Sequence, residues 1–463
     1  LVGSEMCIRD SKSKMRQMRF RVGLVFQYPE YQIFEETVAK DIAFGPRNMG
    51  LAEEEVQARV RETAAIVGLS EEILKQSPFL LSGGQKRRVA IAGVMAMRPE
   101  VLILDEPTSQ LDPIAASDFL AVLGKINREL GTAVVLTEHR LEEAFPLATA
   151  VAVMDRGRLL CTGTPQQVGR QLKTLGHGMF LAMPAAMRIW AATDSKAACP
   201  ISVCDGRNWL LDYAKTHELR PVPEEKKNTP NGETVVSARE LWFKYDKDLP
   251  DVVKGLSLEL HKGEFLALLG GNGTGKTTTL KLLASLQKPY RGELSITGSV
   301  GMLPQNPQAL FVKSTVRADL LEILPKSERK TERLAQVVSL CKLSELLDRH
   351  PYDLSGGEQQ RAALAKILLL NPDILLLDEP FSALDPATKR QMYDVMRDVH
   401  ERFDCTIVFV THDFAEARIL ADRVGIVLGG RLRTVRETGR LFDVDGLDDD
   451  VLAFLDIDGE TTR

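Results

Sequence analysis

The residues with the clearest chemical potential are a glycine-rich run that ends in lysine and threonine. The run reads Gly270, Gly271, Asn272, Gly273, Thr274, Gly275, Lys276, Thr277. It fits G-x-x-x-x-G-K-[ST], the spacing of a phosphate-binding loop. Residues 264–269 before it form an apolar run that predicts a buried strand, and residues 278–284 after it predict a helix. Backbone amides at such a strand–loop–helix junction bind anions, so the pattern favours a phosphate site over a turn with a chance lysine.

Acidic residues and a histidine follow two other apolar runs. Asp378 and Glu379 come directly after the run 374–377, and His412 follows the run 406–410. A carboxylate at the C-terminal end of a parallel strand faces the ligand crevice, so Asp378 is expected to bind Mg²⁺ together with Thr277. Glu379 is the natural general base or water-orienting group for attack on a phosphate. His412 is a candidate for the same site. The alternative is a structural histidine whose hydrogen bonds are made within the core.

The composition is that of an ordinary globular protein of several domains. The chain has 463 residues, 44% of them hydrophobic and 27% charged, and a net charge of −5. That charge gives no indication of a nucleic-acid-binding surface. The six cysteines are scattered without metal-site spacing and are expected to be reduced thiols of a cytosolic protein. No run of 18 apolar residues occurs, so any membrane role is expected to come through a partner.

The second half of the sequence repeats the first. The motif 81–85 (LSGGQ) matches 354–358 (LSGGE), and the run 101–107 matches 374–380, each with an offset of 273. The same offset relates 109–113 to 382–386 and His139 to His412, whereas Gln27 matches Gln305 at an offset of 278. A constant offset over four motifs predicts two copies of one α/β domain.

These motifs resemble the nucleotide-binding domains of ATP-binding cassette (ABC) proteins, and the resemblance covers most of the chain. It implies a fold of two P-loop ABC ATPase domains, each a mostly parallel sheet core with a helical subdomain that carries LSGG. It also implies ATP and Mg²⁺ as ligands, and two domains that pair head to tail within the chain. Each ATP site then joins the phosphate loop of one half to the LSGG motif of the other.

The resemblance assigns roles to matching residues of this sequence. Adenine is expected to stack on Tyr245, and Thr278 extends the phosphate loop; a core tyrosine is the alternative for Tyr245. The catalytic group is expected to comprise Glu379, His412 and Gln305 in the second half and Glu106, His139 and Gln27 in the first. The metal ligands are expected to be Thr277, Gln305, Asp378 and Asp105. The signature residues are Ser82, Gly83, Gly84, Gln85, Ser355, Gly356, Gly357 and Glu358.

The first half lacks a phosphate loop. Lys276 lies 29 residues before Gln305, so the equivalent lysine, 29 residues before Gln27, would fall near position −2 of the chain numbering. Because Glu106 and His139 are retained, we expect truncation rather than a degenerate site. The chain as given is then expected to build one full composite site, closed by Ser82–Gln85 of the first half.

Several features favour a transporter ATPase. Both copies read S-x-L-D-P and H-x-x-x-E-A, whereas soluble ABC translation factors typically show N-H-L-D. The segment from Val25 to Pro46 resembles the cobalt and vitamin importers of the energy-coupling factor (ECF) type. In that family the segment after the glutamine binds coupling helices of a transmembrane protein. The equivalent surfaces here are Tyr28–Pro46 and Asn306–Leu320, with an ordinary amphipathic helix packed on its own domain as the alternative.

The expected organisation has four parts. Residues 1–19 resemble a translated adapter or a disordered start, and residues 20–175 form the first ABC domain. Residues 176–233 form a linker, with a short helix at 185–190, and residues 234–463 form the complete second domain. The acidic end, 443–458, is expected to be a short solvated helix.

The resemblance implies an ATP-hydrolysing subunit that energises uptake of a vitamin, a vitamin precursor or a metal ion. Its partners would be an ECF transmembrane coupling protein and a substrate-binding component, with no nucleic acid. It would lie peripherally on the cytoplasmic face of the cell membrane. One alternative is a soluble tandem ABC ATPase acting on the ribosome. Another is a fragment that folds but binds nucleotide weakly.

Overall fold

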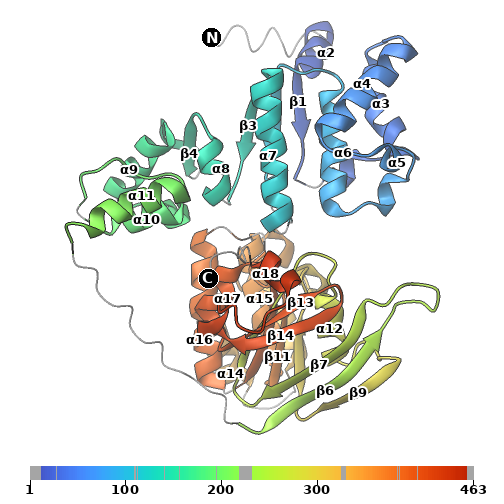
Figure 1. Ribbon diagram of the computed structural model, residues 1–463. Helices are drawn as coiled ribbons and strands as arrows, with labels where there is room; N and C mark the ends of the chain where they lie inside the picture. Colours follow the sequence, from blue (N-terminus) through green and yellow to red (C-terminus); the bar gives the residue numbers. More distant parts are fainter. Residues whose placement is uncertain are drawn as a thin grey trace. The chain divides into compact units, whose positions relative to one another are not determined.

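The computed structural model describes residues 12–27, 29–108, 111, 113–139, 141–155, 157–193, 195–217, 232–324, 330–382, 384, 386–403 and 405–455. The chain divides into two compact units, Leu1–Leu219 and Arg220–Arg463. Figure 1 shows the course of the chain in both units. None of the helices among the described residues has the length and apolar character needed to cross a membrane.

The second unit is built on a six-stranded sheet of order β10-β11-β12-β8-β13-β14. All neighbouring strands are parallel except the antiparallel pair β13–β14. The strands are β8 (Phe265–Leu269), β10 (Val300–Leu303), β11 (Ile374–Asp378), β12 (Thr406–Thr411), β13 (Arg423–Leu428) and β14 (Arg431–Glu437). The three central strands β8, β11 and β12 are buried along their whole length, as expected for parallel strands covered on both faces. The predicted α/β fold with a mostly parallel sheet is confirmed.

Alternate residues of β8 enter two different cores. Phe265, Ala267 and Leu269 pack in the cluster formed with the helices α15 and α16. Leu266 and Leu268 pack in a second cluster with α12 and an antiparallel three-stranded sheet of order β7-β6-β9. That sheet comprises β6 (Thr234–Phe243), β7 (Val253–His261) and β9 (Arg291–Ile296). The period of two along β8 therefore links the two layers of the unit.

Most helices of the second unit come between these strands in the sequence, and α18 follows the last strand. They are α12 (Lys276–Leu283), α13 (Val316–Ile323), α14 (Lys330–Leu340), α15 (Gly356–Leu368), α16 (Pro386–Phe403), α17 (Phe414–Leu420) and α18 (Asp449–Phe454). The short 3-10 turns are η4 (Pro307–Leu310), η5 (Pro351–Asp353) and η6 (Thr438–Arg440). The expected helix near the acidic end is α18, which Asp448 caps at its N-terminus.

The first unit repeats part of this arrangement. Its parallel sheet has the order β1-β2-β3, with β1 (Val22–Val25), β2 (Val101–Asp105) and β3 (Ala133–Thr137). The helices around it are α3 (Val38–Asn48), α4 (Glu53–Ile66), α5 (Glu71–Leu74), α6 (Gly83–Met95), α7 (Pro113–Leu130) and α8 (Leu141–Leu147), with the turns η1 (Pro29–Gln32) and η2 (Pro78–Leu80). Val22 pairs with Val101 just as Val300 pairs with Ile374, so the repeat extends to strand register.

The sheet of the first unit is divided where the second unit has β8. The strands β4 (Val151–Asp155) and β5 (Arg158–Gly163) form a separate antiparallel pair. Among the described residues of this unit, no strand takes the place that β8 holds between β12 and β13. The consequence is visible in burial, because Val135 of β3 is 54% exposed while its equivalent Val408 is 0% exposed.

The prediction of a linker over residues 176–233 is wrong for residues 176–193 and 195–217. These residues contain η3 (Gly178–Ala182), α10 (Ala185–Ala191) and α11 (Val203–Ala214), which follow α9 (Pro165–Leu175). Their apolar side chains form a core of their own with β4 and α9, which includes Met183, Met187 and Trp190. The elements are short and follow no known motif, so their packing could not be inferred from sequence. Residues 218–231 lie outside the described residues.

The expected non-native or disordered start, 1–19, lies partly outside the described residues. From Lys12 onward the chain is helical, as α2 (Lys12–Arg21), and the first strand begins at Val22. The helix has almost no amphipathic pattern, which is why it went unpredicted, but it is rich in the strong helix formers Lys, Arg, Gln and Met.

Candidate nucleotide site

The phosphate loop of the second unit lies where its sequence placed it. The chain leaves β8 at Leu269 and enters α12 at Lys276. Gly273 and Gly275 have φ angles of 78° and 95°, which favour glycine, and a Cβ on Gly270 would lie 2.3 Å from the Val427 carbonyl oxygen. No side chain caps α12. The loop thus presents a helix N-terminus to an anion.

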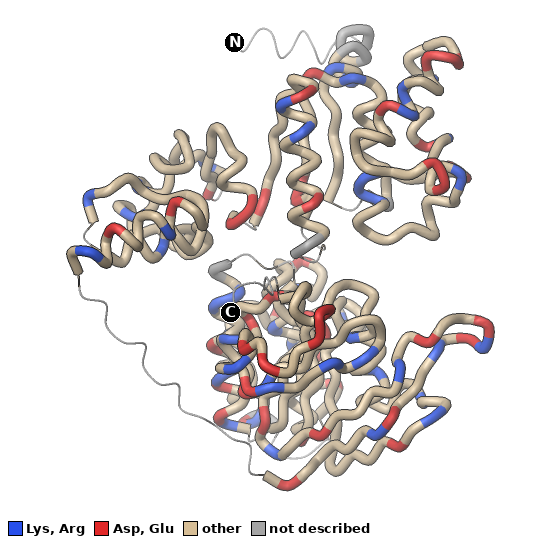
Figure 2. Tube along the Cα trace, in the orientation of Figure 1, with Lys and Arg blue, Asp and Glu red and all other residues tan. Residues whose placement is uncertain are grey.

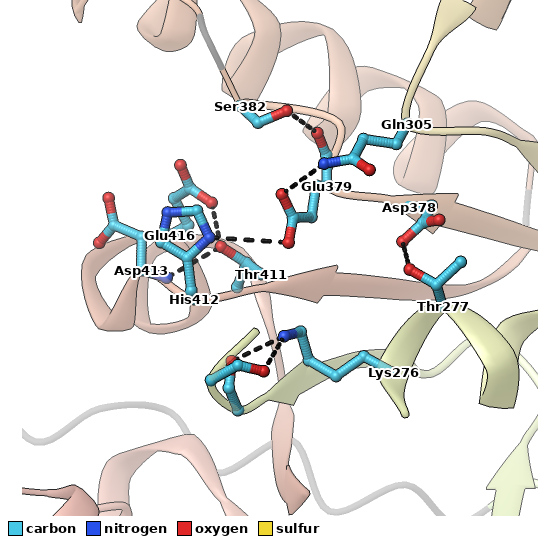
Figure 3. Close-up of polar contacts among 12 residues, drawn as sticks. Lys276, Thr277, Gln305, Asp378, Glu379, Ser382, Thr411, His412, Asp413 and Glu416 are labelled. Atoms are coloured by element: carbon cyan, nitrogen blue, oxygen red, sulfur yellow. Dashed lines mark hydrogen bonds and ion pairs between the residues drawn. The ribbon is translucent and has the colours of Figure 1, made fainter. Parts of the chain in front are cut away.

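Lys276 is buried and folds back over this loop. Its Nζ donates to the carbonyl oxygens of Gly270 and Gly271, both at 2.7 Å (Figure 3). Its ammonium therefore lies at the mouth of the predicted phosphate site. Tyr245 is 53% exposed, and its hydroxyl lies 3.0 Å from the Thr278 hydroxyl. Tyr245 is therefore not a core residue, which was the alternative. Its exposed ring at this loop is suited to the predicted stacking on adenine.

Thr277 and Asp378 come together as the predicted metal ligands. The Thr277 hydroxyl donates to Asp378 Oδ1 at 2.9 Å, and Asp378 is only 2% exposed (Figure 3). Burial raises the pKa of the Asp378 carboxyl, against the hydrogen bond from Thr277. A bound divalent cation would offset that burial cost, and a carboxylate with a hydroxyl is the oxygen donor set Mg²⁺ prefers. The residues present therefore fit Mg²⁺, which would supply charge neutralisation at the phosphates.

Glu379 lies at the centre of the predicted catalytic group. Gln305 Nε2 donates to its Oε2 at 3.0 Å, and His412 Nδ1 lies 3.7 Å from its Oε1. Burial raises the pKa of Glu379, but His412, Lys276 and Gln305 outweigh it, so the pKa lies below its ordinary value. Glu379 is thus held ionised, as a general base requires. Its φ of 47° is an uncommon backbone conformation of the kind that concentrates at functional sites.

Gln305 was predicted to serve both metal and water. The structure places its amide on Glu379, on the side away from His412 in Figure 3. The structure thus brings together Gln305, Glu379 and His412 as one group, and Thr277 with Asp378 as another.

The first unit assembles the equivalent catalytic group. Gln27 Nε2 donates to Glu106 Oε2 at 2.8 Å, and His139 Nε2 lies 2.8 Å from Glu106 Oε1. The contact with His139 lowers the pKa of Glu106 below its ordinary value. Glu106 has a φ of 42°, close to that of Glu379. Asp105, predicted as a metal ligand, is exposed and accepts a hydrogen bond from Thr137. Among the described residues, no phosphate loop covers it.

The two signature motifs begin helices. Ser82 caps α6, where its hydroxyl accepts from the Gln85 amide and its own amide donates to the Gln85 side chain. Ser355 and Glu358 make the same capping box on α15. Ser82, Gly83, Ser355 and Gly356 are exposed. Each signature therefore offers a solvent-facing helix N-terminus, the feature that a γ-phosphate would require.

Two residues of the repeated motifs, Ser382 and Glu416, make contacts beside this site that were not predicted from the sequence. The Ser382 hydroxyl donates to the Glu379 carbonyl oxygen at 2.9 Å and so holds the turn that carries the predicted general base. Glu416, four residues after the histidine, is 3% exposed and contacts Thr411 and Lys389. Both belong to repeated motifs, S-x-L-D-P and H-x-x-x-E-A, and that recurrence was the available signal.

Comparisons with known proteins agree with this geometry. The profile of the ABC transporter family matches residues 5–109 and 253–382. A putative ABC transporter ATP-binding protein of Bacillus cereus is 37% identical over 427 residues, which cover 88% of this chain and 75% of that protein. The chain belongs to the ABC transporter family. Its two units are therefore ABC ATPase domains, and the protein is an ATP-hydrolysing enzyme.

Two further similarities bear on this ABC ATPase. A putative ABC transporter ATP-binding protein of Methanosarcina acetivorans is 34% identical over 460 residues, covering 93% of this chain and 74% of that protein. Among solved structures, the archaeal ribosome recycling factor aABCE1, in complex with the ribosomal stalk protein aP1, matches with a TM-score of 0.60. It is 22% identical and covers 94% of this chain and 79% of that chain, so this likeness concerns the fold alone.

Proposed function

We propose that this ABC ATPase energises solute uptake as the tandem ATP-binding subunit of an ECF-type importer. Its solute would be a vitamin, a vitamin precursor or a metal ion, and it would act at the cytoplasmic face of the membrane. The observation that carries the proposal is an exposed aromatic surface directly after the catalytic glutamine of the first unit. We call it the first docking surface and define it as residues 31–46, which lie within the predicted segment Tyr28–Pro46.

Aromatic side chains dominate the first docking surface. Tyr31, Phe34 and Phe44 are 82%, 56% and 43% exposed, and the Phe34 and Phe44 rings pack edge to face at 4.6 Å. Exposed aromatic pairs of this kind mark interaction sites more often than ordinary surface. Asp41 accepts from the amides of Phe34 and Glu35 and so holds the loop against α3. The alternative of an ordinary amphipathic helix accounts for the buried face of α3 but not for these exposed rings.

The equivalent surface of the second unit, residues 306–320, is held differently. Asp319 is 1% exposed and accepts from the amides of Val312 and Lys313. Lys366 of α15 reaches Asp319 Oδ1 at 2.8 Å and the Leu310 carbonyl oxygen at 2.6 Å. This surface is rigid and less aromatic, with Val312 as its exposed apolar residue, 65% exposed. Lys/Arg and Asp/Glu are interspersed over each unit (Figure 2). We infer that a membrane partner contacts both surfaces through different side chains.

Co-purification tests the proposal. The native protein, tagged in its source cells, should bring down integral membrane subunits in mild detergent. The double variant Phe34→Ala/Phe44→Ala should lose them while its ATPase activity in isolation is retained. Leu211→Ser is a matched control, because Leu211 is an equally exposed apolar residue (58%) on α11, outside both surfaces. If the protein instead co-sediments with ribosomes and brings down no membrane subunit, the importer proposal is wrong and the soluble ribosomal ATPase is favoured.

ATP hydrolysis at the phosphate loop of the second unit is tested by Lys276→Ala, which is expected to lower the hydrolysis rate because Lys276 is the predicted phosphate-binding cation. Equal activity of wild type and Lys276→Ala would favour the inactive-fragment alternative.

A further inference from the structure

We propose that Lys389 and Glu416 position the predicted catalytic histidine, His412, through a buried network. The proposal rests on the predicted catalytic role of His412. Glu416 lies on α17, only 3% exposed, and Lys389 lies in the first turn of α16. Lys389 Nζ donates to Glu416 Oε1 at 2.8 Å.

The network reaches the backbone on both sides of His412. The Thr411 hydroxyl donates to Glu416 Oε2 and accepts from the Asp413 amide at 3.0 Å (Figure 3). One hydroxyl therefore fixes the residue before the histidine and the residue after it. Asp413 in turn caps α17 by accepting from the Ala415 amide, and Lys389 lies 3.8 Å from its other carboxylate oxygen. The backbone of His412 is thus tied to α16 through Lys389.

Burial makes this network dependent on its cation. Burial raises the pKa of Glu416, against the attraction of Lys389 and the hydrogen bonds from Lys389 and Thr411. A buried carboxylate without a cation is costly, so removing Lys389 would change how Glu416 holds Thr411. With the network intact, the His412 side chain is only 13% exposed and its Nδ1 lies 3.7 Å from Glu379 Oε1.

The first unit holds its histidine by other contacts. At the offset of 273, Lys389 is replaced by Ala116 and Thr411 by Glu138. Glu138 accepts from the amide and hydroxyl of Thr108, at 2.9 and 2.6 Å, and from the His139 amide at 3.1 Å. His139 has a side chain 43% exposed and contacts Glu106 at 2.8 Å. In the second unit the lysine that contacts Glu416 and Asp413 comes from α16.

Steady-state ATPase kinetics of the full chain test the proposal. Lys389→Met is expected to lower kcat by about 10-fold or more with KM for MgATP unchanged, because misplacement of a catalytic group by an ångström costs up to about 100-fold. Lys389→Arg is expected to rescue kcat. Lys389→Met/Glu416→Gln is expected to lose no more than Lys389→Met, since both residues act as one unit. Arg402→Met on α16 is the control, because its exposed ion pair with Asp398 has no link to the histidine.

His412→Ala separates the possible failures. If His412→Ala keeps wild-type activity, the predicted role of His412 is wrong, and so is the positioning built on it. If His412→Ala loses activity but Lys389→Met does not, only the positioning is wrong. Additive losses in the double variant would also overturn it. Should Lys389→Met fail to fold, the pair Thr411→Ser and Thr411→Val decides, with retention expected for Ser and the kcat loss for Val.

Discussion

The ion pair between Lys366 and Asp319 allows a stability prediction from geometry alone. Asp319 is 1% exposed, and the Lys366 side chain is 10% exposed. Replacing Lys366 by Met keeps the length of the side chain but leaves a buried carboxylate without its cation. Breaking a buried pair in this way costs about 3–5 kcal/mol. In a domain the size of the second unit, each kcal/mol lowers Tm by roughly 2–4 °C, so Tm should fall by roughly 6–20 °C.

Calorimetry of the full chain should show this loss in the transition of the second unit. Arg317→Met is the matched control, because Arg317 pairs with Asp348 at 3.1 Å with both side chains largely exposed, 47% and 84%. Such a surface pair contributes less than about 1 kcal/mol. The variant Lys366→Met/Asp319→Asn should lose less than the sum of the single changes. Equal Tm shifts in Lys366→Met and Arg317→Met would refute the reasoning.

Three further predictions concern the predicted catalytic residues and the helix α10. Glu379→Gln should lower the rate of phosphate release by about 100-fold or more while nucleotide binding is retained, and Glu106→Gln should leave the rate of this chain unchanged. Because the pKa of Glu106 lies below its ordinary value of 4.5, its contribution to stability is present above pH 4.5 and lost as the pH falls through the folded value. Urea unfolding should therefore show Glu106→Gln destabilised at pH 7, with a difference from wild type that shrinks as the pH falls below 4.5. Met187→Ala should lower the free energy of unfolding by about 2–5 kcal/mol, because Met187 is 0% exposed. An unchanged free energy would indicate that α10 is not packed in a core.

The features of this protein that depend on local chemistry could be predicted from its amino-acid sequence. The phosphate loop from Gly270 to Thr277 requires glycine at positive φ and lysine at a fixed spacing, so its pattern is readable without a structure. The apolar run 374–377 before Asp378 and Glu379 predicted a buried parallel strand, which is β11. The offset of 273 between the halves placed Glu106 and His139 by the same reasoning.

Which of these residues contact one another, and which further residues hold them in place, depends on the packing of the folded chain. The contact of Lys389 with Glu416 joins α16 to α17 across 27 residues, and that of Lys366 with Asp319 spans 47. The helices α10 and α11 are stable because they share a core with β4 and α9, not because of their own periodicity. The divided sheet of the first unit, with Val135 exposed, is likewise a matter of which strand lies beside which. Such contacts depend on three-dimensional packing, whereas motif spacing records only local geometry.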